Sequence, residues 1–372
     1  MAILVLNAGS SSPKFGVVDP DADRDWLGGT VDHAPSAAEI ESAVRRIAAR
    51  LAAQPAVPAI DAVAHRIVHG GAAFTRPVRV TPDVREALGQ LAELAPLHNP
   101  PGLRVIDAAR AVWPDVPHIA VFDTAFHATM PPEAFTYPLP FQWTERWQLR
   151  RFGFHGASNA YCARRASQML QRPANTLRLV VAHLGNGASV TAIDRGHSAD
   201  TSMGFTPLEG LMMGTRSGSI DPGLLLYLQT RCGVSIEALE HALNQESGLL
   251  GVSGVSSDMR AVLDSALAGH GRAGLAVRIF VHRARQAIGA MAVTLGEVDA
   301  LVFTGGIGEH SAEVRGAICD GLALLGLDLD ERVNQSARPD AIVSTESSHG
   351  RILVIATRED LEIARAATRL LG

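Results

Sequence analysis

The chain has 372 residues, of which 47% are hydrophobic and 19% charged, a composition typical of a globular protein with room for two domains. The formal net charge of -5, without a long basic run, argues against nucleic acid or an anionic membrane as the main partner. The three cysteines lie far apart and form no C-x-x-C pair, and no apolar run is long enough to span a bilayer. We therefore expect neither a disulfide framework nor a membrane anchor, and a cytoplasmic location.

The first segment predicts two strands joined by a polar turn. Ile3–Leu6 is apolar, residues 7–12 (NAGSSS) are small and polar, and Phe15–Asp19 is again β-rich. Main-chain N–H groups in such a turn suit a phosphate. Lys14, the only lysine in the chain, directly follows the turn, where its compact ammonium would serve as a point charge for an anion. The alternative is that the position of Lys14 has no functional meaning.

The next hundred residues alternate helices and strands. The expected elements are a helix after the capping box Ser36–Glu39, a strand over 62–68, a helix opened by Thr81-Pro82, a proline-fixed loop at 97–100, a helix over 103–113 and a strand over 118–122. The first strand delivers Arg66 to a Gly-Gly corner, and the second ends at Asp123. In α/β folds, ligands usually bind at this end of a strand.

A second hairpin of the same design occupies Leu179–Ile193. A strand stops at Gly185–Gly187, where two glycines permit a close approach to the main chain, and a β-rich run follows. Taken alone, this segment is an ordinary hairpin or a phosphate loop. Because it repeats the first hairpin down to the closing Asp, we expect a duplicated domain with a nucleotide held between the halves. A third corner, Gly305–Glu309, precedes a helix that we expect to begin near Ser311, which is another anion site.

The boundary between the two halves is predicted in the proline-rich stretch between Thr129 and Leu149. The first domain is expected to comprise residues 1–127 with 361–372, and the second residues 128–360. Further expected elements are a helix from about Ser158, a helix capped by Asp221, a long helix over 277–295, a strand over 352–355, the polar corner 357–360 and a terminal helix that packs back on the first domain.

Two arginines and two acids are candidates for a site. Arg66 lies in an apolar strand and Arg216 in a loop of small residues without an obvious carboxylate neighbour, which indicates an anionic substrate unless each forms a structural ion pair. Asp123 could instead cap the end of a strand, and Glu359 could complement a helix dipole.

Three histidines adjoin corners of the chain. His98, His155 and His183 stand beside glycine, asparagine or proline, although each could be an ordinary core or surface histidine. The Walker sequence G-x-x-x-x-G-K-[ST] is absent from the chain, so a bound nucleotide would need phosphate corners of the kind described above.

A series of motifs, running from Asn7 to the terminal helix, resembles the acetate kinases. The motifs are LNAGSSSPKF, HRIVHGG, PLHNP, VFDTAFHATMP, RRFGFHG, HLGNGASV, DTSMGFTPLEGLMMGTRSGSIDP, ESGLLGVSG, FTGGIGE and TREDLEIA. Each alone would be weak, but their order and spacing make the resemblance specific. The resemblance implies an α/β protein of the actin, Hsp70 and sugar kinase fold, with two duplicated ribonuclease H-like domains. Each would have a mixed sheet flanked by helices, and the nucleotide would lie in the cleft.

The resemblance also implies which side chains meet the reacting groups, namely Arg66, His98, Asp123, His155 and Arg216. Arg66 would bind the carboxylate substrate, and Asp123 would act as catalytic acid/base or organise the metal. His155 with Arg216 would stabilise the transition state. A carboxylate that attacks a polyphosphate meets charge repulsion, which cations and aligned donors offset.

Binding residues are implied by the same matches. The acyl methyl pocket would be lined by Val68, Leu97, Phe154 and Pro207. Mg²⁺, or Mn²⁺ in its place, would be bound at Asn7 and Glu359. The nucleotide site would comprise Lys14 at the phosphates together with His183, Leu184, Gly185, Asn186, Gly187, Asp258, Met259, Arg260, Gly306, Ile307, Gly308, Glu309 and His310.

The implied activity is the reversible, metal-assisted transfer of a phosphoryl group from ATP to acetate, in line and without a covalent intermediate, by a homodimer. A propionate or butyrate kinase of the same fold is the first alternative, and Val68 is the residue that would discriminate. A nucleotide switch of the Hsp70 or actin kind is the second, and it has no need of Arg66, Asp123 and Arg216 together. A NAD-linked dehydrogenase is more remote, since Gly305–Gly308 lacks the G-x-G-x-x-G spacing.

Four residues depart from the family pattern. Pro13 stands where Leu or Ile is usual, Asn159 where a histidine is usual, Ser219 in place of Asp, and Arg358 in place of Asn. None of them replaces a proposed catalytic residue. We expect them to affect local geometry and turnover rather than the type of reaction.

Overall fold

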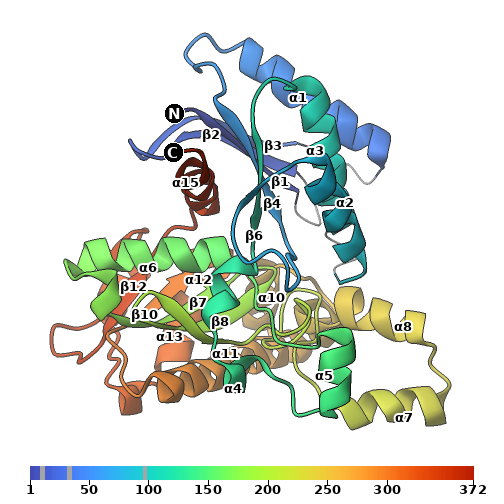
Figure 1. Ribbon diagram of the computed structural model, residues 1–372. Helices are drawn as coiled ribbons and strands as arrows, with labels where there is room; N and C mark the ends of the chain where they lie inside the picture. Colours follow the sequence, from blue (N-terminus) through green and yellow to red (C-terminus); the bar gives the residue numbers. More distant parts are fainter. Residues whose placement is uncertain (9–12, 32–35, 95–98) are drawn as a thin grey trace. The chain divides into compact units, whose positions relative to one another are not determined.

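The computed structural model describes residues 1–8, 13–31, 36–94 and 99–372 (Figure 1). The chain forms two compact units. Unit 1 contains Met1–Ala128, Phe154–Tyr161 and Arg358–Gly372, and unit 2 contains Thr129–Gly153 and Cys162–Thr357. The C-terminal segment therefore returns to the unit in which the chain begins. Residues 9–12 of the first predicted polar turn lie outside the described residues, as do Leu97 and His98.

Unit 1 is built on a mixed sheet of six strands in the order β3-β2-β1-β4-β6-β5. The strands are β1 (Ile3–Ala8), β2 (Pro13–Asp19), β3 (Arg24–Thr30), β4 (Ala62–Ile67), β5 (Val78–Arg79) and β6 (His118–Phe122). The first three form an antiparallel meander, β4 and β6 continue the sheet parallel to β1, and β5 is antiparallel to β6. β4 and β6 are almost entirely buried, as expected of parallel strands covered on both faces.

The helical elements of unit 1 include the four predicted helices, of which the first two begin at their predicted caps. They are α1 (Ala37–Ala52), α2 (Pro82–Gln90), the 3₁₀ helix η1 (Leu91–Leu94), α3 (Asn99–Val112), the 3₁₀ helix η2 (Ala125–Thr129), which extends by one residue into unit 2, and α15 (Glu359–Leu371). The capping box is confirmed, because the Glu39 N–H donates to the Ser36 hydroxyl at 3.2 Å and the Ser36 N–H donates to the Glu39 carboxylate at 2.9 Å. Thr81 caps α2 in a similar way.

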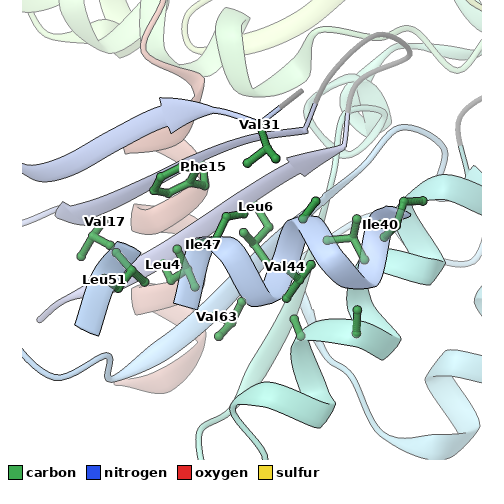
Figure 2. Close-up of a cluster of buried hydrophobic side chains, with 14 of the residues drawn as sticks. Leu4, Leu6, Phe15, Val17, Val31, Ile40, Val44, Ile47, Leu51 and Val63 are labelled. Carbon is green, nitrogen blue, oxygen red and sulfur yellow. The ribbon is translucent and has the colours of Figure 1, made fainter. Parts of the chain in front are cut away.

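Helix α1 covers one face of the unit 1 sheet with an apolar stripe. Its residues Ile40, Val44, Ile47 and Leu51 recur every three or four positions and therefore share one face of the helix. Figure 2 shows this stripe packed on side chains of the sheet, among them Leu4, Leu6, Phe15, Val17 and Val63. Helix α3 packs beside α1. Burial of these side chains provides the main stabilisation of this layer.

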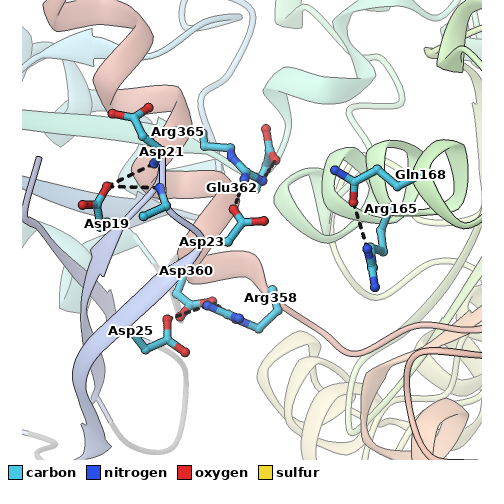
Figure 3. Close-up of polar contacts among 11 residues, drawn as sticks. Asp19, Asp21, Asp23, Asp25, Arg165, Gln168, Arg358, Asp360, Glu362 and Arg365 are labelled. Atoms are coloured by element: carbon cyan, nitrogen blue, oxygen red, sulfur yellow. Dashed lines mark hydrogen bonds and ion pairs between the residues drawn. The ribbon is translucent and has the colours of Figure 1, made fainter.

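Helix α15 lies on the other face of the same sheet and contacts β1, β2, β4 and β6 (Figure 1). The expected packing of the terminal helix on the first half of the chain is thus confirmed. Ion pairs tie its start to the β2–β3 hairpin, as Figure 3 shows. Arg358 bonds to Asp25 at 2.5 Å and to Asp360 at 3.2 Å, and Arg365 bonds to Asp23.

Unit 2 repeats the sheet of unit 1 strand for strand. Its order is β11-β12-β10-β7-β8-β9. The strands are β7 (Arg178–Leu184), β8 (Ala188–Asp194), β9 (His197–Thr201), β10 (Ala300–Thr304), β11 (Ala341–Ile342) and β12 (Arg351–Val354). The meander, the two parallel strands and the antiparallel edge recur. The register shift in the β2–β3 pair, at Val17/Val18, also recurs at the equivalent position of the β8–β9 pair, at Ala192/Ile193. The predicted duplication is confirmed.

Unit 2 carries most of the helices. They are α4 (Pro132–Phe135), α5 (Phe141–Trp147), α6 (Gly156–Leu170), whose first turns belong to unit 1, η3 (Ala174–Thr176), α7 (Pro222–Cys232), α8 (Ile236–His241), the π-helical turn η4 (Ala242–Glu246), α9 (Gly248–Ser253), α10 (Met259–Leu267), α11 (Gly271–Leu295), α12 (Gly305–His310), α13 (Ala312–Cys319), η5 (Ala323–Leu325) and α14 (Glu331–Ser336). The long helix α11, predicted over 277–295, packs on β7, β8 and β9 with buried apolar residues that include Val281, Ala284, Ile288 and Met291.

Two predicted loops are helical, and these predictions were wrong. Asn99 and Pro100 form the first turn of α3, where proline is tolerated because no N–H is needed there. Gly305–Glu309 forms α12 directly after β10, with Gly305 at a φ of 76°. The helix expected near Ser311 is α13, which Ser311 caps. None of the described helices combines the length and apolar character that crossing a bilayer requires.

Candidate active site

The C-terminal ends of neighbouring strands in unit 1 bring three predicted residues together. Asn7 on β1 is paired in register with Arg66 on β4, and Asp123 directly follows β6. The Arg66 Nε donates to Asp123 Oδ1 at 2.9 Å and Nη2 donates to Oδ2 at 2.5 Å, while Nη1 donates to the Asn7 side-chain oxygen at 3.0 Å. The guanidinium is therefore held by a two-bond fork on one side and by an amide on the other.

The carboxylate of this pair is deeply buried, whereas 15% of the Arg66 side chain is exposed. Asp123 is only 2% exposed. Burial by itself would lower the pKa of Arg66, but the charges of Asp123 and Glu359 and the bonds to Asp123 outweigh it and raise the pKa. Arg66 thus has a structural ion-pair partner, which corrects the interpretation of an unpaired arginine. The effect of Glu359, at the start of α15, shows that this predicted metal residue lies within electrostatic reach of the cluster.

His155 is fixed on an unusual backbone at the start of α6. Its φ of 58° lies in the left-handed region, which is uncommon for a residue with a side chain and often accompanies a functional site. The next residue, Gly156, donates its N–H to the Asp123 carbonyl at 3.0 Å. A Cβ at position 156 would lie 2.1 Å from that oxygen, so only glycine fits. Asn159 bonds the His155 carbonyl through its side-chain amide at 3.0 Å.

The proposed acyl pocket residues Val68 and Phe154 both belong to unit 1 and are 8% and 1% exposed. The ring of His69 meets that of Phe154 edge to face at a centroid distance of 5.5 Å. The His69 N–H donates to Asn99 Oδ1 at 3.1 Å, and Asn99 Nδ2 donates to the His69 carbonyl at 3.0 Å. Asn99, which sequence reasoning missed, therefore fixes the corner after Val68. Pro207 belongs to unit 2.

His127 forms a hydrogen bond to the backbone of Phe154. Its Nε2 lies 2.8 Å from the carbonyl of Phe154, which makes Nε2 the protonated nitrogen. Burial lowers the pKa of His127 to about 4, although this hydrogen bond acts in the opposite direction. His127 is therefore neutral at physiological pH and donates to the segment that leads into His155.

Arg216 lies on a loop of unit 2 that is closed by its own polar contacts. Its Nη1 donates to the carbonyl of Pro207 at 3.3 Å, and burial lowers the pKa of its guanidinium. Ser219, one of the four residues that differ from the family pattern, accepts the Gly210 N–H through its hydroxyl oxygen at 3.0 Å. Its own N–H donates to the Gly210 carbonyl at 2.9 Å. Serine thus closes this loop where the family usually has aspartate.

A second polar network supports the same loop and was missed at the sequence level. Glu209 accepts the hydroxyl of Tyr137 and bonds to Arg151 at 2.7 Å, while the Phe205 N–H donates to the Tyr137 oxygen at 2.9 Å. Burial, together with the bond to Glu209, raises the pKa of Tyr137 above its ordinary value. Gly204 approaches this network so closely that a Cβ would collide with the Glu209 carboxylate.

A pocket of about 860 Å³ opens within unit 2. The hairpin corner between β7 and β8, the start of α10 and the helix α12 line it. The predicted nucleotide residues among its lining are Gly185, Asn186, Asp258, Met259, Arg260, Gly306, Ile307 and His310. Asp258 caps α10 and also binds Arg260 at 2.6 Å, and these bonds lower the pKa of Asp258. The pocket is large enough for a nucleoside.

Other predicted nucleotide residues do not line this pocket. His183 and Leu184 lie on β7 and Gly187 lies in the turn to β8, while the Gly308 carbonyl accepts a bond from Arg315 at 2.9 Å. The Glu309 carboxylate is bonded to Thr357. Lys14 lies on β2 of unit 1.

The remaining lining residues were missed at the sequence level. They are Ser257, Leu263, Asp264, Leu267, Ser311 and Glu313. Arg260, Leu263, Asp264 and Leu267 recur every three or four positions along α10, so they share one face of that helix. This spacing was visible in the sequence and could have identified the face, which includes the exposed Leu267.

Known proteins with related sequences and structures share this architecture. Residues 29–365 match the family model of the acetokinase family. An acetate kinase from Deinococcus radiodurans is 47% identical over 392 residues, which cover 100% of this chain and 98% of that protein. One from Gloeobacter violaceus is 45% identical over 398 residues, with 98% of each covered.

Solved structures agree over the whole chain. The acetate kinase of Porphyromonas gingivalis has a TM-score of 0.89 at 34% identity, with 100% of both chains covered. A propionate kinase from Francisella tularensis has a TM-score of 0.90 at 37% identity, with 98% of both covered. The predicted resemblance and fold class are thus confirmed.

The buried His127 predicts a specific dependence of stability on pH. Its pKa is about 4 in the folded state and 6.5 in the unfolded state, so its stabilising contribution is complete above pH 6.5 and is lost as the pH falls toward 4. The loss should reach about 3 kcal/mol. His127→Gln, which keeps a donor for Phe154, should make the free energy of unfolding less sensitive to pH. Urea unfolding at pH 7.5 and 4.5 measures the difference.

His65 and His118, whose pKa values burial also lowers, are present in both proteins and cancel in this comparison. An equal pH dependence of wild type and His127→Gln would contradict the assignment.

Proposed function

The chain belongs to the acetokinase family, and we propose that it transfers the terminal phosphoryl group of ATP to acetate in a reversible reaction that gives acetyl phosphate and ADP. The match over residues 29–365 is the observation that carries this proposal, because it spans both the Arg66–Asp123 cluster and the pocket of unit 2. A nucleotide switch without an acyl substrate would have no use for the buried arginine cluster.

The reaction joins two anions, and the side chains of the site serve that problem. A carboxylate oxygen of acetate forms a bond to the terminal phosphorus, and the bond from that phosphorus to the bridging oxygen of ADP breaks. Arg66 binds the acetate carboxylate, while its fork to Asp123 keeps the guanidinium oriented. Arg216 and His155 stabilise the charge on the transferred group. His98 belongs to the proposed catalytic set as well.

The proposed metal residues fit Mg²⁺, with Mn²⁺ as a substitute. Among the described residues, no three His, Cys, Asp or Glu side chains cluster in a way that could hold a metal on their own. Mg²⁺ in phosphoryl-transfer sites is commonly held by one or two protein groups, with phosphate oxygens and waters completing its shell. Asn7 and Glu359, close to Arg66, provide such a small oxygen donor set. When bound, the metal neutralises charge on the phosphate oxygens.

The nucleoside occupies the pocket of unit 2, and Lys14 contacts the phosphates. The proposed acyl substrate residues are Arg66, Val68, Leu97, Phe154 and Pro207. In this proposal, residues 1–127 with 361–372 form the acyl substrate domain and residues 128–360 the adenosine domain. A cytoplasmic location is supported by Cys232 and Cys319, which are free thiols.

A homodimer is also part of the proposal, and exposed apolar side chains support it. Phe141 of α5 is 65% exposed and Ile236 of α8 is 67% exposed, and Trp143, Trp147, Leu226 and Tyr227 are exposed on α5 and α7. Large exposed aromatic residues are typical of interfaces. A second copy of the chain would cover them in a twofold arrangement.

We expect Arg216→Ala to lower kcat/KM for acetate by about 10²- to 10³-fold, the usual loss for one donor to developing charge. Arg216 is a cleaner test than Arg66, since removing Arg66 takes from the buried Asp123 the cation that compensates its charge, at a cost of roughly 3 to 5 kcal/mol. Steady-state kinetics measures kcat/KM, and the affinity for ADP should persist because Arg216 does not line the pocket. Near-normal kcat/KM would defeat the assigned role.

Acetate should be preferred over propionate, and Val68 should set this preference. An extra methylene in a closed apolar pocket costs roughly 1 to 3 kcal/mol, so propionate should be about 10- to 200-fold poorer. Valine is branched at Cβ and does not swing aside cheaply. A coupled assay of ADP formation with acetate, propionate and butyrate measures the ratio of kcat/KM values.

In the same assay, Val68→Ala should raise kcat/KM for propionate relative to acetate. A propionate kinase is the second candidate function, because the solved propionate kinase from Francisella tularensis is as similar in structure as the acetate kinases. Wild-type preference for propionate would favour that candidate. An unchanged ratio in Val68→Ala would show that another residue limits acyl length.

The protein should sediment with the mass of two chains of 39.3 kDa. The double variant Phe141→Glu with Tyr227→Glu should sediment as a monomer, because two charges would have to be buried at the interface. Leu324→Glu provides a matched control, since Leu324 is 93% exposed on η5 and lies outside the proposed surface. Analytical ultracentrifugation distinguishes the masses, and a dimer that survives the double substitution rules out this surface.

A further inference from the structure

Glu309 lies on α12, a helix that contributes to the proposed nucleotide pocket. Its carboxylate bonds to Thr357, the last residue of unit 2 before the chain enters unit 1. Its Oε1 accepts the N–H of Thr357 at 2.9 Å and the hydroxyl of Thr357 at 2.6 Å. Three other residues of the same short helix, Gly306, Ile307 and His310, line the pocket. A six-residue helix moves as one body, so the position of the pocket wall and that of Glu309 are linked.

The hydroxyl of Thr357 is fully used and therefore fixed. Because its proton goes to Glu309, its oxygen acts as acceptor for the Gly305 N–H at 2.9 Å and for the Thr304 hydroxyl at 3.0 Å. Thr357 is thus bonded to the last residue of β10, to the first residue of α12 and to Glu309. These bonds connect the β10–α12 corner to the segment that follows β12.

Thr357 is the last residue of unit 2, and the next residue begins the final segment of unit 1. Arg358 is bonded to Asp25 and Asp360, and its carbonyl accepts the Glu362 N–H at 3.3 Å in the first turn of α15. Glu359, whose charge acts on Arg66, is the first residue of this turn. One residue therefore separates the anchored Thr357 from the proposed metal ligand.

The duplication gives Thr357 a structural counterpart in unit 1, which is Asp123. In unit 1, Asn7 pairs with Arg66, and Asp123 lies two residues beyond the residue of β6 opposite Arg66. In unit 2, His183 pairs with Thr304, and Thr357 lies two residues beyond the continuation of β12 opposite Thr304. The Thr304–Thr357 contact thus occupies the place of the Arg66–Asp123 pair.

We propose that Glu309 and Thr357 are positioning residues that couple occupancy of the nucleotide pocket to the first turn of α15, and so to Glu359. The inference rests on the proposed function, since it takes the pocket as the nucleotide site. A bound nucleotide would restrict the motion of α12 and with it Glu309. The hydrogen bonds of Glu309 would then restrict Thr357, and the backbone from Thr357 to Glu359 would restrict Glu359. Glu309 acts through Thr357 and not by contact with the nucleotide.

Hydrogen–deuterium exchange with ADP in the presence of EDTA tests this coupling, because no metal can then bridge the nucleotide to Glu359. In wild type, ADP should slow exchange in peptides covering 305–310 and also in peptides covering 355–362. Thr357→Val keeps the shape of the side chain but removes the hydroxyl. In this variant ADP should still protect 305–310, and the slowing at 355–362 should fall by about fivefold or more, the lower range of a typical coupling.

Two further variants separate coupling from a merely structural role. Thr357→Ser keeps the hydroxyl and should behave like wild type, whereas Glu309→Ala should lose the remote protection by breaking the contact from the other side. Remote protection that survives in both Thr357→Val and Glu309→Ala overturns the proposal. Absence of protection at 305–310 in wild type instead overturns the nucleotide site itself, so the two failures are distinguishable.

Discussion

The buried ion pair between Arg66 and Asp123 is the constraint on which the rest of unit 1 depends. A charge pair so far from water is tolerated only when both partners are held in good geometry and their remaining polar atoms are bonded. The fork to Asp123 and the bond to Asn7 meet that requirement. They also tie together the ends of β1, β4 and β6. A shift of one residue in any of these strands would turn one of the three side chains to the other face, so the pair also fixes the register.

The backbone of Asp123 extends the same constraint to the next segment. Its carbonyl accepts the Gly156 N–H, and the approach is so close that a side chain at 156 is excluded. His155 must then enter α6 through a left-handed conformation, which costs of order 1 kcal/mol for a residue other than glycine. Asn159 and His127 bond the carbonyls of His155 and Phe154 and hold this conformation in place. Asn159, which differs from the histidine usual in the family, therefore stabilises the backbone at His155.

Local patterns in the sequence were sufficient for the frame but not for the partners within it. Both hairpins, the capping box and the duplication depend on short segments whose periodicity and turn residues act locally, and all were confirmed. The Arg66–Asp123 pair joins residues 57 positions apart and follows from strand register, which local patterns do not define. Gly-Gly and Pro-Pro pairs favour loops in isolation, yet the first turn of a helix accepts both, so the first turn of α3 and the whole of α12 were missed. The α10 face of the pocket was missed because its signal is helical spacing, which ordinary surface and core helices also show, whereas glycine corners are distinctive.

The duplicated frame carries different chemistry at equivalent positions in its two copies. Unit 1 has Asn7, Lys14, Arg66 and Asp123 at the places where unit 2 has His183, Ser189, Thr304 and Thr357. The first set contains two cations and a carboxylate, which suits anions that react. In the second set, two hydroxyl groups bond to each other where unit 1 has its ion pair. Hydroxyls carry no net charge and therefore avoid the desolvation penalty of an ion pair. In unit 2 a pocket lined mainly by α10 and α12 is instead the proposed site of the nucleoside. One sheet thus supports charge at its edge in one copy and supports a helix-lined pocket in the other.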